Sequence, residues 1–129
     1  MAKLSRELFG LTKALDAIRG DLDDMPIQQA LTLLHVGLQP GITHAELVKA
    51  IGMEQSSVSR NTAALSKWHR LGKPGLDLIE QFEDPRERRR KIVYLTPKGR
   101  ARISKALVAL TGGPVDFDPV MSKEGMDRL

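Results

Sequence analysis

The stretch that decides the fold runs from residue 43 to residue 60 and reads Thr43-His44-Ala45-Glu46-Leu47-Val48-Lys49-Ala50-Ile51-Gly52-Met53-Glu54-Gln55-Ser56-Ser57-Val58-Ser59-Arg60. It opens on a capping box, in which the Thr43 hydroxyl accepts a bond from a free helix amide and the Glu46 carboxylate returns one. Apolar residues follow at helical spacing up to Gly52, where this short helix ends. A tight turn leads into a second helix, predicted from about Gln55 to Arg70. Two short helices joined by a tight turn are typical of a helix-turn-helix.

A β-hairpin is predicted after these two helices. Residues 76–82 favour one strand, and residues 92–95 favour a second, because β-branched and aromatic side chains are common in strands. The polar segment between them, residues 83–91, is the predicted hairpin tip and carries four arginines. A helix-turn-helix followed by such a hairpin is a winged helix-turn-helix. The predicted fold class is therefore mainly α, with a small antiparallel β-hairpin as its wing.

Further helices are predicted on both sides of this unit. Apolar residues at helical spacing indicate a first helix from about Ser5 to Arg19 and a second one that begins near Pro26. The second helix is expected to face the core with Ile27, Ala30, Leu31, Leu34 and Leu38. After the hairpin, Thr96 and Pro97 begin a final helix that ends near Gly112.

The chain of 129 residues is long enough for one domain and divides into three parts. Residues 1–20 and 97–111 are the predicted dimerisation helices, residues 26–96 the winged helix-turn-helix, and residues 112–129 an acidic C-terminal tail. The apolar stripe of the first helix is longer than a small domain must bury alone. We therefore expect it to pack with the last helix across a two-fold axis. The expected dimer contacts are Leu4, Leu8, Leu11, Leu15, Ile18, Ile103, Leu107 and Leu110.

Positive charge is concentrated in one part of the chain. The sequence holds 20 Lys or Arg residues against 16 Asp or Glu residues, which gives a net charge of +4. Between residues 60 and 102, twelve basic residues stand against five acidic ones. A local excess of this size is typical of a surface that binds a polyanion, although a solvated basic surface has the same composition.

The predicted second helix of the helix-turn-helix has an outer face that suits a DNA major groove. With Val58 directed inward and about 100° per residue, positions 56, 60, 63 and 67 point outward, and none carries a large apolar side chain. The arginines of the hairpin tip can follow the DNA backbone or enter a narrow minor groove. The expected DNA-binding residues are Gln55, Ser56, Ser57, Ser59, Arg60 and Lys67 in the helix, and Arg86, Arg88, Arg89 and Arg90 in the wing.

Two segments share their pattern with a known group of proteins. They read Ile51-Gly52-Met53-Glu54-Gln55-Ser56-Ser57-Val58-Ser59-Arg60 and Asp84-Pro85-Arg86-Glu87-Arg88-Arg89-Arg90-Lys91-Ile92-Val93-Tyr94-Leu95-Thr96-Pro97-Lys98-Gly99-Arg100. The chain resembles the MarR family of winged-helix transcription regulators, from about residue 27 to residue 110. The second segment is the more specific one, since the family's wing has a similar acidic-x-Arg pattern, then an apolar strand and Leu-Thr-x-x-Gly.

The resemblance implies a homodimer that binds a palindromic site in double-stranded DNA. The residues placed in the major groove by this resemblance are Ser56, Ser57 and Arg60. Arg89 would enter the minor groove, steadied by Glu87, while Arg88 and Arg90 would lie on the flanking backbone. Many relatives also bind a small-molecule effector, and nothing in this sequence identifies one.

Three features depart from the family pattern. Glu87 stands where the family usually has Asp, and residues 71–79 make a longer link than usual. Only one clear helix follows the wing, whereas the family commonly has two long ones there. A compact chain of this kind would suit a phage or a mobile element.

Two other classes of function compete with DNA binding. Catalysis is disfavoured because His35, His44 and His69 stand in unrelated positions and no metal-hydrolase or phosphate-binding motif occurs. The absence of cysteine excludes a disulfide, a thiolate zinc site and thiol-based oxidant sensing. We therefore expect neither an enzyme nor a cofactor. The remaining alternative is a winged-helix adaptor that binds another protein, such as an inhibitor or an accessory of replication or partition.

The expected location is the cytoplasm, with no membrane partner. The sequence contains no run of about 18 apolar residues, and its first residues are charged rather than typical of a signal peptide. The pattern does not distinguish a repressor from an activator.

Overall fold

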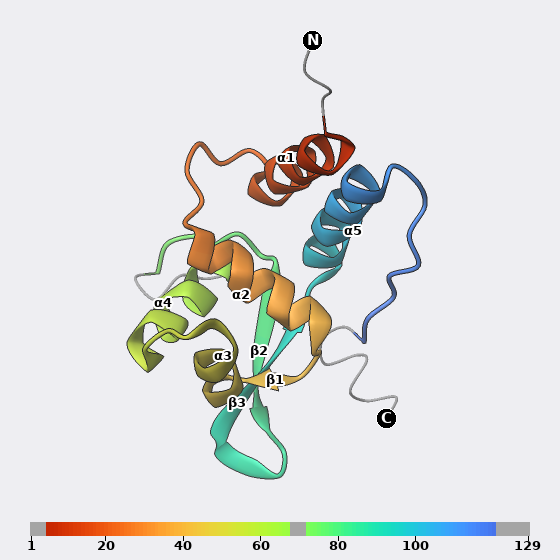
Figure 1. The fold of residues 1–129 in the computed structure, drawn as a ribbon. Coiled ribbons are helices and arrows are strands. Elements are labelled where there is room, and N and C mark those ends of the chain that lie inside the picture. Colours follow the sequence, from red (N-terminus) through yellow and green to blue (C-terminus); the bar gives the residue numbers. More distant parts are fainter. Residues whose placement is uncertain (1–4, 68–71, 121–129) are drawn as a thin grey trace.

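The computed structural model describes residues 5–67 and 72–120, and within them the chain forms five helices and three strands (Figure 1). The helices are α1 (Arg6–Arg19), α2 (Ile27–Leu38), α3 (His44–Ile51), α4 (Gln55–Leu65) and α5 (Pro97–Thr111). The strands are β1 (Ile42–Thr43), β2 (Ile79–Asp84) and β3 (Glu87–Leu95). The predicted class, mainly α with an antiparallel wing, is confirmed.

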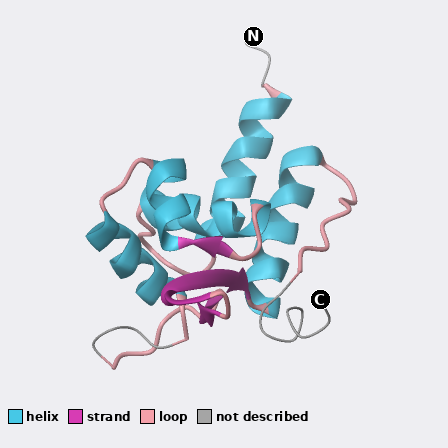
Figure 2. Cartoon of the chain, turned by 90° about the horizontal axis from the view of Figure 1, so that it is seen from below, coloured by secondary structure: helices cyan, strands magenta, loops and turns pink. Residues whose placement is uncertain are grey.

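The three strands form one antiparallel sheet with β3 in its centre, between β1 and β2. Strands β2 and β3 are the predicted wing, and Ile79 pairs with Leu95 at its base. Strand β1 was not predicted, because it consists of Ile42 and Thr43 alone and two residues show no periodicity. Figure 2 shows the strands gathered together, with the helices mainly on one side of them.

The helix-turn-helix forms as its sequence predicts. The Thr43 hydroxyl accepts a bond from the Glu46 amide at 3.1 Å, and the Thr43 amide donates to Glu46 Oε1 at 3.0 Å, so the capping box is confirmed. Helix α3 ends at Gly52, whose φ of 76° lies in the left-handed region that favours glycine. Met53 is buried under the turn and accepts a bond from Asn61 Nδ2 at 3.5 Å. These contacts fix the angle between α3 and α4.

Helix α4 ends at Leu65, five residues earlier than predicted. The cause is a short connector, residues 75–78, whose N–H groups donate to the carbonyls of residues 64–67 at 2.8–3.2 Å. These bonds occupy carbonyls that a longer helix would have used. Gly75 lies so close that an added Cβ would collide with the Ser66 carbonyl oxygen. Strand β2 consequently begins at Ile79 rather than at residue 76.

The same connector contacts the start of α5. The Thr96 hydroxyl donates to the Asp77 carbonyl at 2.6 Å, and the Thr96 amide donates to the Leu78 carbonyl at 3.1 Å. Thr96 is also the N-cap of α5, because its hydroxyl accepts a bond from the Gly99 amide at 3.1 Å. An added Cβ at Gly99 would collide with the Leu78 carbonyl oxygen. The Leu-Thr-x-x-Gly pattern thus holds the connector between α4 and α5.

Helices α1 and α5 pack against each other within one chain, at the end of the molecule opposite the wing (Figure 1). Their close approach depends on Gly10, because an added Cβ there would lie 2.8 Å from the Leu110 carbonyl oxygen. Ile18 and Ile103 are each 3% exposed and belong to the core of this chain. The contact that was expected between two copies therefore occurs inside one, and these two isoleucines are unavailable to a partner.

Helix α2 crosses the middle of the molecule, and its buried face agrees only in part with the predicted one. Its core residues are Ala30, Leu33 and Val36, together with the polar Thr32. Ile27 and Leu38, which were expected in the core, are 61% and 78% exposed, and Leu31 is 37% exposed. Ala30 was predicted correctly and Leu34 packs against the core, whereas Ile27, Leu31 and Leu38 were placed wrongly. The reason is that α2 carries apolar residues on more than one face, so periodicity alone does not choose among them.

The segment after α5 is loop-like, as expected. Helix α5 ends at Gly112, and Asp118 then pairs with Arg100 at 3.2 Å. Phe117 packs against the core near Gly37. The rest of the predicted tail, residues 121–129, lies outside the described residues.

Candidate nucleic-acid interface

The outer face of α4 carries small polar residues and one arginine. Gln55, Ser56 and Arg60 are exposed, and Ser57 and Ser59 are half-buried beside them. Val58 is fully buried, so the inward direction assumed for this helix is correct. Arg60 Nη2 donates to Ser57 Oγ at 3.3 Å, which holds the guanidinium along the helix surface. A face of this shape and polarity suits a major groove.

Two positions on this helix differ from their predicted placement. Ala63 is 7% exposed and thus belongs to the protein interior rather than to the outer face. Lys67 is exposed but lies in a bend beyond the end of α4, where it accepts a bond from the connector through its carbonyl. Residues 68–70, the last part of the helix predicted to reach Arg70, lie outside the described residues.

Three of the four wing arginines, Arg88, Arg89 and Arg90, lie on strand β3 rather than on a hairpin loop. The turn between the strands contains only Pro85 and Arg86. Glu83 pairs with Lys91, whereas the next residue, Asp84, pairs with Glu87. The pairing register therefore shifts between Glu83 and Asp84, and Arg88, Arg89 and Arg90 are extra residues of β3 without a partner on β2. This irregularity makes the tip of the wing a β-bulge. A bulge changes the direction of successive side chains, so the three arginines need not follow strict alternation.

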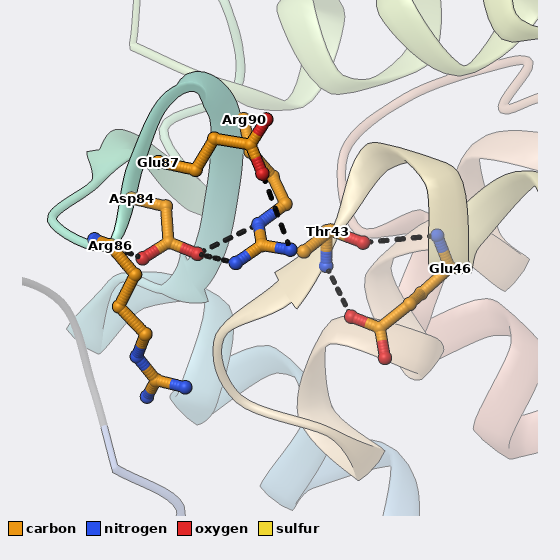
Figure 3. A network of polar contacts seen from close by, with 6 residues as sticks. All are labelled: Thr43, Glu46, Asp84, Arg86, Glu87 and Arg90. Carbon is orange, nitrogen blue, oxygen red and sulfur yellow. Dashed lines mark hydrogen bonds and ion pairs between the residues drawn. The ribbon is translucent and has the colours of Figure 1, made fainter.

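Arg90 is held inside the wing by Asp84 (Figure 3). Its Nε and Nη2 atoms lie 2.8 and 2.7 Å from Asp84 Oδ2, and the Arg86 amide donates to Asp84 Oδ1 at 3.0 Å. The Arg86 amide, and after it the Arg90 guanidinium, lower the pKa of Asp84 below its usual value. Glu87 Oε2 lies 3.9 Å from Arg90 Nη1. Glu87 thus neighbours Arg90, whereas the resemblance had assigned it to Arg89.

A groove of about 390 Å³ separates α4 from the wing, and we call it the α4–wing groove. Its walls come from α3, α4 and β3, and the lining residues are His44, Ala45, Gln55, Ser59, Glu87, Arg89, Arg90 and Lys91. Predicted residues of both the helix and the wing therefore meet in one place. Lys91 and His44 were not among the predicted contacts, although Lys91 continues the basic run of the wing. No pattern marks His44, because its place in the groove depends on how α3 packs against β3.

The remaining predicted wing residues lie elsewhere. Arg86 lines a larger hollow of about 740 Å³ together with Thr43, Glu46 and Tyr94, rather than the α4–wing groove. Arg88 is exposed on the bulge. Beside this hollow, the Thr43 amide and, after it, the Gln39 side chain donate to the Glu46 carboxylate, and these bonds lower the pKa of Glu46.

A second exposed surface lies on α1. Leu8, Leu11 and Leu15 are 64%, 49% and 45% exposed, and Leu110 on α5 is 45% exposed. Leu107 is half-buried against the core. Leu4 lies outside the described residues. The exposed leucines are the part of the predicted dimer surface that remains open in a single chain.

Within residues 5–67 and 72–120, no three His, Cys, Asp or Glu side chains are grouped as a metal site would require. In the same part of the chain, no helix has the length and apolar character needed to cross a membrane.

Comparisons with known proteins identify the fold through structure rather than sequence. No protein-family profile and no curated protein matches the chain. A MarR family transcription regulator superposes with a TM-score of 0.60 at 22% identity, over 82% of this chain and 61% of its own. A variant of S. aureus MepR bound to an oligodeoxyribonucleotide gives a TM-score of 0.63 at 24% identity, over 80% of this chain and 69% of its own. The transcriptional regulator Tm0710 from Thermotoga maritima gives 0.63 at 20% identity, over 81% and 67%.

These likenesses show that the chain has the winged-helix fold of MarR family structures. The chain spans about three fifths of the length of the first of these proteins. The comparisons lend no support to an origin in a phage or mobile element.

Proposed function

We propose that the protein is a sequence-specific transcription regulator that binds double-stranded DNA as a homodimer on a palindromic site. The observation that carries the proposal is the α4–wing groove, where the polar face of α4 meets the basic bulge of β3. Helix α4 would enter the major groove, and the wing would reach the adjacent minor groove. A binding role of this kind needs neither a cofactor nor catalysis.

Two further observations support DNA as the partner. Arg89 and Lys91 line the groove without an ion pair to another described residue, so their charges are available to phosphates. The S. aureus MepR variant, which has the same fold, was solved with an oligodeoxyribonucleotide.

The homodimer rests on the exposed leucines of α1. Three large apolar side chains on one helix face are costly to leave in water, and a two-fold partner would cover the same face on both copies. Such a dimer would present two α4 helices to DNA, about one helical turn apart.

The test is a selection of bound sequences from random duplex DNA, followed by salt titration of the selected site. We expect a palindromic consensus and an affinity that falls steeply as salt rises, because phosphate contacts release counterions. A selection that yields no consensus, together with weak and salt-independent binding, would contradict the proposal. The protein would then fit the alternative class, a winged-helix adaptor that binds another protein.

A further inference from the structure

His44 lies at the start of α3, and its ring is held by a chain of hydrogen bonds. Nε2 of His44 lies 2.7 Å from Gln81 Oε1 on β2. Gln81 Nε2 donates to Ser66 Oγ at 3.2 Å, and Ser66 Oγ donates to the Thr62 carbonyl of α4 at 2.7 Å. The chain thus runs from α3 through the wing to the end of α4.

This chain determines which ring nitrogen of His44 carries the proton. The only hydroxyl hydrogen of Ser66 goes to the Thr62 carbonyl, so Ser66 Oγ must accept the bond from Gln81. The amide nitrogen of Gln81 therefore faces Ser66, and its oxygen faces His44. Because an amide oxygen only accepts, Nε2 of His44 is the donor. In the neutral ring, Nδ1 is consequently a bare acceptor.

The surroundings of His44 are those of an anion site. The ring lines the α4–wing groove, whose charged residues are Arg89, Arg90, Lys91 and Glu87 on β3. Glu87 lies near Arg90, and α4 contributes only the neutral Gln55 and Ser59. Gln81 on β2 is neutral. On α3 itself, the Glu46 carboxylate is bonded to Gln39 and to the Thr43 amide.

We propose that the α4–wing groove binds a backbone phosphate of double-stranded DNA, and that His44 contacts this phosphate only when its ring is protonated. A neutral ring presents the lone pair of Nδ1, which repels a phosphate oxygen. A protonated ring presents an N–H donor and a positive charge, while Nε2 keeps its bond to Gln81. This inference rests on the proposed function, since it assigns one phosphate of the same DNA.

The consequence is that binding DNA takes up a proton at His44. A phosphate bound beside the ring favours its charged form. Affinity must therefore increase as pH falls through the range in which histidines titrate, about pH 8 to pH 6. Carboxylates, lysines and arginines keep their usual charge over that range.

The experiment measures the affinity for a rhodamine-labelled, mixed-sequence duplex of two helical turns, at both ends of this pH range and at several salt concentrations. For the parent protein, we expect about a tenfold gain in affinity at the lower pH for each contacting copy. The slope of log affinity against log salt should also steepen there by about one for each contacting copy. His44→Gln should remove both effects.

Two further variants separate this role from a structural one. His35→Gln changes the other described histidine, which lies on α2 away from the groove, and it should keep the parent's pH dependence. His44→Lys places a permanent cation in the groove, and it should bind at the higher pH as the parent does at the lower one. If His44 only supported the fold, lysine at this position would not raise the affinity for DNA at the higher pH. Circular dichroism melting of each variant checks that the fold is retained.

The outcomes distinguish this inference from the proposed function. A parent protein that binds DNA but whose pH dependence survives in His44→Gln would overturn the role of His44 and leave DNA binding intact. A parent protein that does not bind the duplex at either pH, even at low salt, would overturn the proposed function, and the phosphate site with it.

Discussion

The arginines of the wing differ from one another in what holds them. Two nitrogens of Arg90 contact the Asp84 carboxylate, and this ion pair stabilises the bulge. Arg89 lines the α4–wing groove and has no ion pair with another described residue. Arg90 is fixed by its ion pair, whereas Arg89 is free to extend outward. The two arginines should therefore contribute differently to DNA binding.

For the wing, we predict that Arg89→Ala weakens binding most at sites with A·T-rich flanks, where the minor groove is narrow and its potential more negative. Arg88→Ala should weaken all sequences alike and reduce the salt slope by about one. Arg90→Ala should weaken all sequences and also lower the melting temperature, because Asp84 loses its partner. The measurement is a salt titration on two duplexes that differ only in their flanks. If every variant keeps the parent's slope on both duplexes, the wing does not touch DNA.

For α4, we predict that Arg60→Ala costs about 1–3 kcal/mol of binding free energy at each half-site, provided that Arg60 reads a base edge. Preference at one base position should relax at the same time. Lys49→Ala, an exposed substitution on α3, is a suitable control. An even loss across all sequences would show that Arg60 holds a phosphate, and an unchanged binding curve would remove it from the interface.

For single residues, the sequence predicts the direction of a side chain on its helix better than it predicts the hydrogen-bond or ion-pair partner of that side chain. The outward placement of Ser56 and Arg60 follows from periodicity around Val58, because a helix repeats regularly. Periodicity fails at Ala63, which is 7% exposed although it was expected on the outer face. The pair of Asp84 and Arg90 depends on the size of the β-bulge, which no local pattern encodes.

Among the elements, the short connector between α4 and β2 makes backbone hydrogen bonds to both α4 and the start of α5. Its four backbone N–H groups end α4, and its carbonyls accept bonds from the start of α5. The sequence indicates only a break in this region, because hydrogen bonds between distant segments leave no periodic signal. Strand β1 and the exposure of Ile27 and Leu38 on α2 were missed for the same reason, since packing against other elements decides both.

The connector provides a prediction on stability. Gly75→Ala should lower the free energy of unfolding by about 1–3 kcal/mol, because the new methyl group collides with the Ser66 carbonyl oxygen and forces the backbone apart. Gly113→Ala is the matched control, since an added Cβ there meets no atom within 4 Å. Thermal unfolding of both variants checks the difference. Equal stability of the two would mean that the connector does not press on α4.

Acid should destabilise the base of the wing and the start of α3. The pKa values of Asp84 and Glu46 lie below their ordinary values of 3.8 and 4.5, chiefly because backbone amides donate to both carboxylates. A lowered folded pKa contributes stability above the ordinary pKa, and this stability is lost as pH falls through the folded value. We therefore expect the melting temperature to fall steadily below about pH 4. Asp84→Asn should show a weaker acid dependence, and a parallel curve for that variant would contradict the assignment.

For the whole molecule, the exposed leucines of α1 lead to a prediction on its oligomeric state. We predict that light scattering of the parent protein at micromolar concentration gives the mass of a dimer, and that Leu11→Glu with Leu15→Glu gives a monomer. These leucines are exposed in the single chain, so the substitutions leave its core unchanged. Leu38→Glu is the matched control, because Leu38 is 78% exposed on α2 rather than on α1. A monomeric parent, with and without DNA, would reject the dimer.

The connector has a mechanical consequence for such an assembly. Residues 75–78 join the last turn of α4 to the first turn of α5, and Gly75 and Gly99 leave no free space at the two contacts. Because the connector is hydrogen-bonded to both helices and closely packed, a shift of α5 must either break these backbone bonds or move α4. The distance between the two α4 helices of a dimer would then be set far from the DNA. Substitutions in the first turn of α5 would alter which operator spacing the protein accepts, with every DNA contact left in place.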